Sequence, residues 1–129
     1  MSDPIIIKPE EVERFCYDCL KSVGAKDSHA KALAEVLVAA DHRGVFSHGL
    51  NRLEMYVQDL KESYISKVDE PKIIKESVST AYIDGCNCLG PVVGNFAMKI
   101  AIDKNKKTGI GWTVAKNSNH YGISGWYTM

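Results

Sequence analysis

Residues 80–115 read TAYIDGCNCLGPVVGNFAMKIAIDKNKKTGIGWTVA. Residues 80–84 are typical of a short strand that ends in a turn at Gly85. Apolar side chains then recur at helical spacing between Pro91, which favours a helix start, and Gly109, which favours a helix end. Residues 110–115 form the strongest strand pattern of the chain. This stretch therefore predicts a strand–helix–strand unit.

The turn inside this unit lacks a conventional phosphate-binding motif. Residues 85–92 read GCNCLGPV, with neither Gly-x-Gly-x-x-Gly spacing nor a Lys-Ser/Thr pair after the second glycine. We expect Gly85 to be a turn residue with positive φ, and Gly90 to lead into the helix with Pro91. The pattern argues against a Rossmann or P-loop nucleotide site.

The chain before this unit has the pattern of a helical block. An extended lead-in over residues 5–8 precedes a helix from Pro9 to Gly24. A second helix is predicted from Asp27, as its cap, to Gly44, and a third from a cap at Ser47 to about residue 60. Residues 72–75 are typical of a further short strand. The predicted class is α/β (α+β), with helices first and strand–helix–strand after them.

Composition excludes several classes of protein. The chain has 129 residues, of which 45% are apolar and 25% charged, and 16 basic side chains balance 16 acidic ones. This profile is that of a globular domain without the basic excess of a nucleic-acid-binding protein. No apolar run reaches the roughly 18–20 residues of a membrane span, and the first residues lack the pattern of a signal peptide. We expect a cytoplasmic protein with no nucleic-acid or membrane partner.

The four cysteines raise the possibility of a zinc module. Cys16 and Cys19 have the spacing of a zinc-binding pair, and Cys86 and Cys88 supply two further sulfurs. The first pair, however, falls on the inward face of the first helix, where cysteine behaves as a small apolar residue. We therefore favour core cysteines with reduced thiols over a metal site, and keep a zinc module as a minor alternative.

The first candidate site lies in residues 47–56, SHGLNRLEMY. At about 100° per residue, His48, Arg52 and Tyr56 would share one strip of a helix. A guanidinium can bind a carboxylate through two hydrogen bonds, and an imidazole can exchange a proton with an adjacent hydroxyl or carbonyl oxygen. These residues suit a hydroxy or keto acid. A solvated polar face is the alternative interpretation.

The second candidate site is the loop KNSNHYG over residues 116–122. It follows the strongest strand and precedes a helix expected to start near Ile123 and to continue to the last residue. Asn119 and Gly122 tolerate left-handed backbone conformations, so His120 could be held on a tight turn. A capping loop with an exposed histidine is the alternative. His29 and His42, near the two ends of the second helix, carry less weight, and Arg43 has the pattern of a surface charge.

Two segments resemble the signatures of a known family. Residues 41–52, DHRGVFSHGLNR, with Tyr56 and Leu60, and residues 117–122, NSNHYG, resemble the malate/L-lactate dehydrogenase family that is distinct from the Rossmann-fold enzymes. Phe46 stands where this family often has aspartate, and Tyr121 where it often has phenylalanine. The resemblance implies NAD(P)-dependent interconversion of 2-hydroxy and 2-keto acids, with the nicotinamide cofactor on a non-Rossmann domain.

The resemblance also implies roles for single residues. His120 and His48 become the acid/base candidates, with His120 preferred, and Ser47 would orient His48. Arg52 would bind the substrate carboxylate with Tyr56 beside it. Asn119 and Gly122 are the cofactor-binding candidates, for NAD or NADP, and no metal ligand is implied. The family further implies a homodimer acting on a small 2-hydroxy or 2-keto acid.

Length sets the expected organisation. We expect residues 1–70 to form the helical segment and residues 71–129 to begin the cofactor-binding domain, most of which would follow in a complete family member. The chain would then be the N-terminal portion of a dehydrogenase. The alternative is a catalytically inactive fragment or isoform that acts as a subunit partner.

Overall fold

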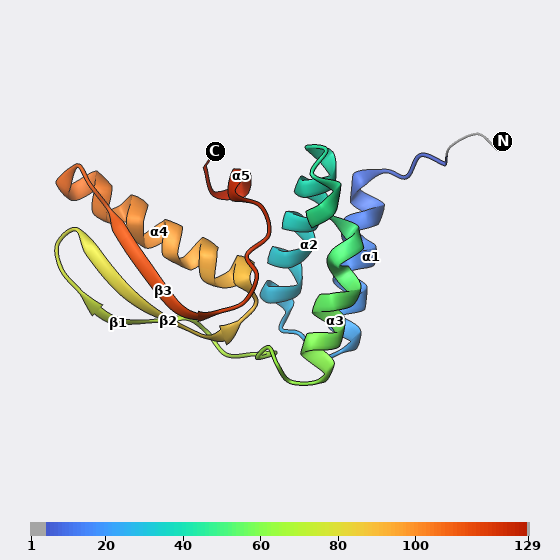
Figure 1. Ribbon diagram of the computed structural model, residues 1–129, viewed down its shortest axis with the longest axis horizontal. Coiled ribbons are helices and arrows are strands. Elements are labelled where there is room, and N and C mark those ends of the chain that lie inside the picture. The colour runs from blue at the N-terminus through green and yellow to red at the C-terminus, as the bar shows by residue number, and fades with distance from the viewer. Residues whose placement is uncertain (1–4, 129) are drawn as a thin grey trace.

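The computed structural model describes residues 5–128 and shows a block of helices beside a small sheet (Figure 1). The first half contains α1 (Pro9–Ser22), α2 (Asp27–His42), the 3-10 turns η1 (Phe46–His48) and η2 (Leu50–Arg52), and α3 (Leu53–Lys61). The second half contains β1 (Lys72–Glu76), β2 (Thr80–Cys88), α4 (Gly90–Thr108), β3 (Trp112–Ser118) and α5 (Ser124–Tyr127). The predicted order of helices followed by strand–helix–strand is confirmed.

The sheet has the strand order β1-β2-β3. β1 pairs with β2 in the antiparallel sense, whereas β3 runs parallel to β2. A parallel neighbour requires a crossover connection, and α4 provides it by crossing one face of the sheet (Figure 1). Ala81 and Ile83 of β2 are buried. The crossover returns the chain at the end of β3 to the side of the helical block.

The apolar core lies mainly among α1, α2 and α3 and reaches into the second half of the chain. Its buried side chains include Leu33 and Leu37 of α2 and Leu60 of α3. Leu89, the residue before α4, is fully buried and belongs to the same cluster. α2 and α4 also contact each other directly. The helical block and the start of α4 therefore share one core.

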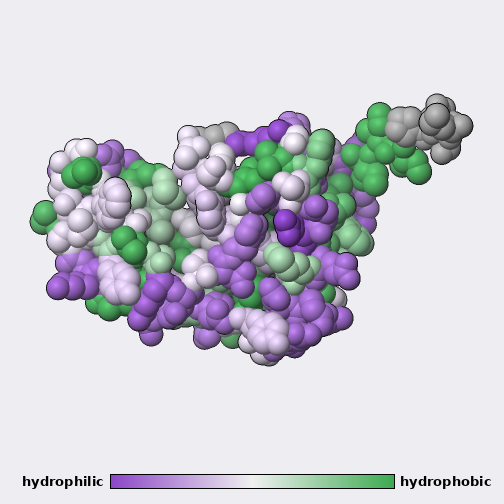
Figure 2. All heavy atoms as spheres, viewed as in Figure 1, coloured by the Kyte–Doolittle hydropathy of each residue, from purple (hydrophilic) through white to green (hydrophobic). Residues whose placement is uncertain are grey.

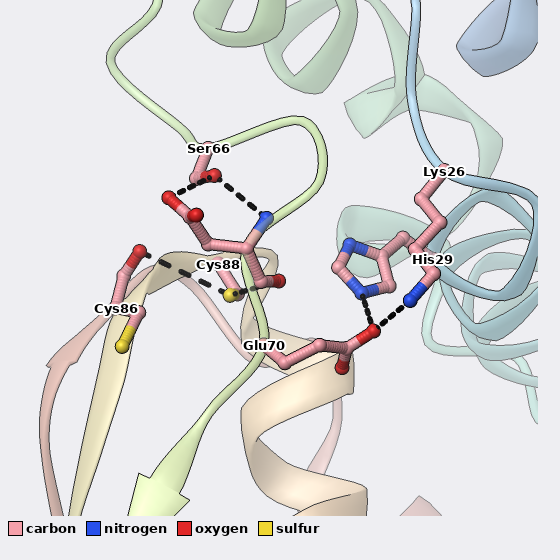
Figure 3. Close-up of polar contacts among 7 residues, drawn as sticks. Lys26, His29, Ser66, Glu70, Cys86 and Cys88 are labelled. Atoms are coloured by element: carbon pink, nitrogen blue, oxygen red, sulfur yellow. Dashed lines mark hydrogen bonds and ion pairs between the residues drawn. The ribbon is translucent and has the colours of Figure 1, made fainter.

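Polar contacts fasten the connection between the two halves (Figure 3). The Glu70 carboxylate accepts a hydrogen bond from Lys26 and lies 3.4 Å, at Oε1, from Nε2 of His29. His29 is buried, although its place in the first turn of a helix did not indicate this. The Cys88 thiol donates to the carbonyl oxygen of Asp69 over 2.9 Å. These contacts fix the segment before β1 against α2 and β2.

The region around Ser47 differs from the predicted single helix. Residues 46–52 form two successive 3-10 turns, and the α-helix begins only at Leu53. Ser47 lies inside the first turn and caps no helix. The cause is Asp41, whose carboxylate accepts the Leu50 N–H over 2.8 Å and occupies the space where a Cβ of residue 49 would lie. A side chain at position 49 would have to displace this carboxylate.

Other boundaries also differ from the expectations. Asp27 is the first residue of α2 and accepts a hydrogen bond from the Tyr17 hydroxyl, so it is not the cap. Gly85 lies within β2 and has no positive φ; Cys86 and Asn87 take the left-handed conformation instead. A Cβ at position 85 would lie 2.6 Å from the Asn117 carbonyl oxygen, so this glycine allows β3 to approach. The strand expected over residues 110–115 is β3, which begins at Trp112 and ends at Ser118.

The two ends of the described chain differ in their packing. Residues 5–7 extend away from the body as an exposed apolar arm (Figures 1 and 2). At the other end α5 is a single turn that stops before Thr128, shorter than the helix expected to continue to residue 129, which lies outside the described range. No helix within residues 5–128 is long and apolar enough to cross a bilayer.

The shared core predicts how the protein unfolds. Leu89→Ala removes a fully buried side chain where the two halves meet, and should lower the free energy of unfolding by about 2–5 kcal/mol in one cooperative transition. Ile102→Ala, at an exposed position of α4, should change it by less than about 1 kcal/mol. Chemical denaturation followed by circular dichroism measures both. Two separate transitions, with one unaffected by Leu89→Ala, would contradict a shared core.

Candidate active site

Two histidines from distant parts of the sequence meet where the helical block faces the loop after β3. His48 ends η1, and His120 lies in the segment between β3 and α5. Their ring centroids are 5.4 Å apart, with the ring planes tilted by 31°. Both rings are partly buried. The structure thus joins the two segments that the sequence singled out as candidate sites.

Tyr56 of α3 holds the His120 ring. Its hydroxyl lies 2.6 Å from Nδ1 of His120 and 3.3 Å from the carbonyl oxygen of the same residue. One proton arrangement satisfies both contacts: Nδ1–H donates to the tyrosine oxygen, and the tyrosine O–H donates to the carbonyl. In that arrangement Nε2 keeps its lone pair. In that tautomer, Nε2 is the ring nitrogen that can accept a proton.

Close packing fixes the backbone around His120. The side-chain oxygen of Asn119 accepts the His120 N–H over 2.6 Å. A Cβ on Gly90, the first residue of α4, would lie 2.1 Å from the His120 carbonyl oxygen. Gly122 has φ +86° and is buried against Val36 of α2, where a Cβ would lie 2.4 Å from that side chain. The loop can take this course because glycine occupies both contact points.

The segment after α2 arranges the other polar groups. Ser47 Oγ lies 2.8 Å from Nδ1 of His48, and Arg52 Nε donates to the Ser47 carbonyl oxygen over 2.7 Å. This hydrogen bond links the end of η2 to η1, and it anchors the Arg52 guanidinium through Nε. His48, Arg52 and Tyr56 converge on this region without the continuous helical strip expected from their spacing.

Burial and neighbouring charge control the protonation of this cluster. The pKa of His120 lies below its usual value, first because burial disfavours the cation, and then because His48 and Arg52 repel a second positive charge. Burial raises the pKa of Tyr56 to about 12, so its hydroxyl keeps its proton near neutral pH. The neutral imidazole of His120 is the form that these surroundings favour.

An open depression of about 390 Å³ lies beside His48. Its other lining residues are Arg43, Val45, Tyr121, Gly122, Ile123, Ser124 and Gly125. Arg43 follows the last residue of α2 and donates from Nη1 to the Gly125 carbonyl oxygen over 2.7 Å. Sequence reasoning treated Arg43 as a surface charge and missed this position. Its place in the segment of residues 41–52 that resembles the family signature, five residues before His48, was the available signal.

Sequence reasoning also missed the support that α5 gives to the loop. The Tyr127 hydroxyl donates to the Tyr121 carbonyl oxygen over 2.7 Å, and Trp126 Nε1 donates to the Asn95 side chain of α4 over 2.9 Å. A Cβ on Gly94 would lie 2.6 Å from the Tyr127 ring. These contacts dock the end of the described chain on α4 and restrain the loop that carries His120.

The cysteines lie apart from this site. Cys16 is fully buried on α1, and burial raises the pKa of its thiol to about 12. Cys88 is buried at the end of β2 with a thiol pKa of about 11, again raised mainly by burial. These are the surroundings of protonated core thiols. Within residues 5–128, no group of three or more His, Cys, Asp and Glu side chains is arranged to hold a metal ion.

Comparison with known proteins identifies the family. The family model for malate/L-lactate dehydrogenase matches residues 7–129. The chain belongs to this family. The L-sulfolactate dehydrogenase of Methanocaldococcus jannaschii is 44% identical over 124 residues, which make up 96% of this chain and 36% of that protein. The malate dehydrogenase of Pyrococcus abyssi is 43% identical over 123 residues, 95% of this chain and 34% of that protein.

Solved structures show the same fold as this malate/L-lactate dehydrogenase family chain. Malate dehydrogenase from Entamoeba histolytica matches with a TM-score of 0.92 at 36% identity, over 98% of this chain and 35% of that one. Malate dehydrogenase from Pyrococcus horikoshii matches with a TM-score of 0.92 at 43% identity, over 95% and 35%. The chain thus spans about a third of the length of these relatives.

The electrostatic arrangement predicts a measurable effect of Arg52. Arg52→Gln removes a cation that disfavours the protonated ring, so the pKa of His120 should rise toward its usual value. NMR titration of the His120 ring protons measures this pKa. The control Arg14→Gln, at an exposed position of α1, should leave the His120 pKa unchanged. A His120 pKa that stays constant or falls in Arg52→Gln would contradict the arrangement.

Proposed function

We propose that the full-length protein is a dehydrogenase that interconverts 2-hydroxy and 2-keto acids with a nicotinamide cofactor. The observation that carries this proposal is the Tyr56–His120 contact: with the ring proton on Nδ1, it leaves Nε2 as the proton-accepting atom of a partly buried imidazole whose pKa is lowered. Such a base suits removal of a hydroxyl proton as hydride leaves the adjacent carbon. The names of relatives, which include malate and sulfolactate dehydrogenases, support the same substrate class.

His120 would move the proton. In oxidation, Nε2 would take the proton of the substrate hydroxyl as the adjacent carbon loses its hydride. The resulting imidazolium keeps its Nδ1–H on the Tyr56 oxygen, so no ring movement is required. In reduction, Nε2–H returns the proton to the carbonyl oxygen. Tyr56 then acts by positioning His120, in addition to the substrate contact that the resemblance implies.

Arg52 would bind the substrate carboxylate. Its Nε is engaged with the Ser47 carbonyl, which sets the direction of the guanidinium. A guanidinium held in this way retains its two terminal nitrogens as a fork that matches a carboxylate. His48, oriented by Ser47, would lie on the other side of the reacting oxygen, where it also helps to lower the pKa of His120.

The donor groups near His120 fit a nicotinamide ring. Asn119 uses its side-chain oxygen for the His120 N–H, which leaves its amide N–H₂ to bind a carboxamide or ribose oxygen. Gly122 presents backbone without a side chain at the wall of the depression. Bound NAD or NADP would accept or supply the hydride, and Asn119 and Gly122 would hold it. We propose that this site works in the full-length protein, as a homodimer.

Turnover tests the proposal directly. Full-length protein, given a panel of 2-hydroxy and 2-keto acids with NAD or NADP in the matching redox state, should convert at least one acid, as read from nicotinamide absorbance. His120→Gln should lower kcat by about 10²–10⁴-fold, the usual contribution of a general acid or base. His42→Gln, an exposed histidine at the end of α2, is the matched control and should retain activity. If wild-type protein turns over none of the acids, the proposal fails.

The pH profile tests the role of His120 further. Oxidation needs the neutral ring, and the pKa of His120 is lowered, so kcat/KM for the hydroxy acid should hold as pH falls through the ordinary histidine range and drop only below it. Reduction needs the protonated ring and should weaken as pH rises through the same lowered pKa. A loss of oxidation activity that begins above the ordinary histidine pKa would contradict this assignment.

A separate measurement tests whether the 129-residue chain acts alone. It spans about a third of its relatives, so we propose that it lacks much of the cofactor site and has no turnover by itself. Titration with NADH or NADPH, followed by cofactor fluorescence, should show no saturable binding to the 129-residue chain. Saturable binding would show that these residues suffice for the cofactor.

A further inference from the structure

Asp41 directs its carboxylate out of its own helix and onto the residues that follow His48. It is the last residue but one of α2, at a helix end where a negative charge is unfavourable because the terminal carbonyl groups carry partial negative charge. Its Oδ2 accepts the Leu50 N–H over 2.8 Å. The carboxylate also covers Gly49, a buried residue, in the space that a side chain there would need. Contacts outside α2 therefore hold this carboxylate.

The backbone that Asp41 holds connects two side chains of the candidate site. Gly49 and Leu50 are the first residues after His48, and Arg52 follows two positions later. The Arg52 N–H donates to the Gly49 carbonyl oxygen over 2.9 Å. A shift of residues 49 and 50 would therefore move both the imidazole on one side and the guanidinium on the other.

Both of these side chains act on His120. The His48 ring centroid lies 5.4 Å from that of His120. After burial, the positive charges of His48 and Arg52 are the further causes that hold the pKa of His120 below its usual value. Charge interactions weaken with separation, so this effect reports how closely the two side chains are held to His120.

We propose that Asp41 is a positioning residue, whose contact with the 3-10 turns keeps His48 in place beside His120. The same contact sets the backbone from which the Arg52 side chain extends. Asp41 acts through these turns and not by touching the substrate. Its consequence for catalysis rests on the proposed function, whereas its effect on the geometry of the histidine pair is measured without turnover.

Asp41→Ala in the full-length protein tests this role. The variant removes the acceptor of the Leu50 N–H, so the cations of His48 and Arg52 should move away and the pKa of His120 should rise toward its usual value. Loss of a negative charge alone acts in the opposite direction, because an anion stabilises the imidazolium. NMR titration of the His120 ring protons measures the change.

Two further variants separate the hydrogen bond from the charge. Asp41→Asn keeps a side-chain oxygen for the same N–H, so it should not raise the pKa of His120. The matched control Asp18→Ala, which removes an exposed carboxylate of α1, should leave this pKa unchanged. A rise in Asp41→Asn equal to that in Asp41→Ala would contradict a role for the hydrogen bond.

Gly49→Ala breaks the same contact from the other side. The new Cβ would collide with the Asp41 carboxylate, so the pKa of His120 should rise although Asp41 is retained. In the double variant with Asp41→Ala the Cβ has room, so the pKa should rise no further than in either single variant. Effects of the two substitutions that add would contradict the inference. Gly49→Ala also serves as the test if Asp41→Ala does not fold.

Turnover then measures the consequence for catalysis. In Asp41→Ala and Gly49→Ala, kcat/KM for a converted 2-hydroxy acid should fall on the order of 10- to 100-fold, as expected when catalytic groups are misplaced by about an ångström. Asp41→Asn should retain most of the activity. If neither Asp41→Ala nor Gly49→Ala raises the pKa of His120, the inference fails even if the wild type is active. A rise in both sustains it even if the proposed function fails.

Discussion

The hydrogen bond between the Tyr56 hydroxyl and Nδ1 of His120 is the contact on which the rest of the site depends. It joins residues 64 positions apart, one on a helix of the first half and one on a loop of the second. Tyr56 is fully buried in the core, so its packing fixes the position of the hydroxyl that holds the imidazole. A ring held at Nδ1 presents Nε2 in one direction, which is the requirement for directed proton transfer.

Several features of the fold serve this contact. The parallel pairing of β3 with β2, with α4 as the crossover, returns the chain to the helical block at His120. Gly90 and Gly122 permit the loop to lie directly on α4 and α2. The contacts of Lys26 and His29 with Glu70 fix the connection between α3 and β1 (Figure 3). The site thus lies where the helical block meets the loop after β3, beside the core that the block shares with the start of α4.

Sequence patterns predicted the elements better than the geometry of the site. Helical spacing located α1, α2 and α4 because their buried faces repeat at the period of a helix. The same logic failed at residues 46–52, where a contact from Asp41 replaces the first turns of the helix with 3-10 turns. Asp41 belongs to α2, so the spacing of apolar residues within 46–52 could not predict this contact. The motifs around His48 and His120 indicated chemistry, and resemblance, rather than spacing, linked the two.

The tautomer of His120 tests the central claim most directly. Nitrogen-15 NMR of the full-length protein, at a pH where the ring is neutral, distinguishes a protonated Nδ1 from a protonated Nε2. We predict the proton on Nδ1 in wild type, the tautomer that satisfies both contacts of the Tyr56 hydroxyl, and a shift toward a mixture of tautomers in Tyr56→Phe, with the core packing kept. A proton on Nε2 in the wild type, or identical spectra for the two proteins, would contradict this description of the site.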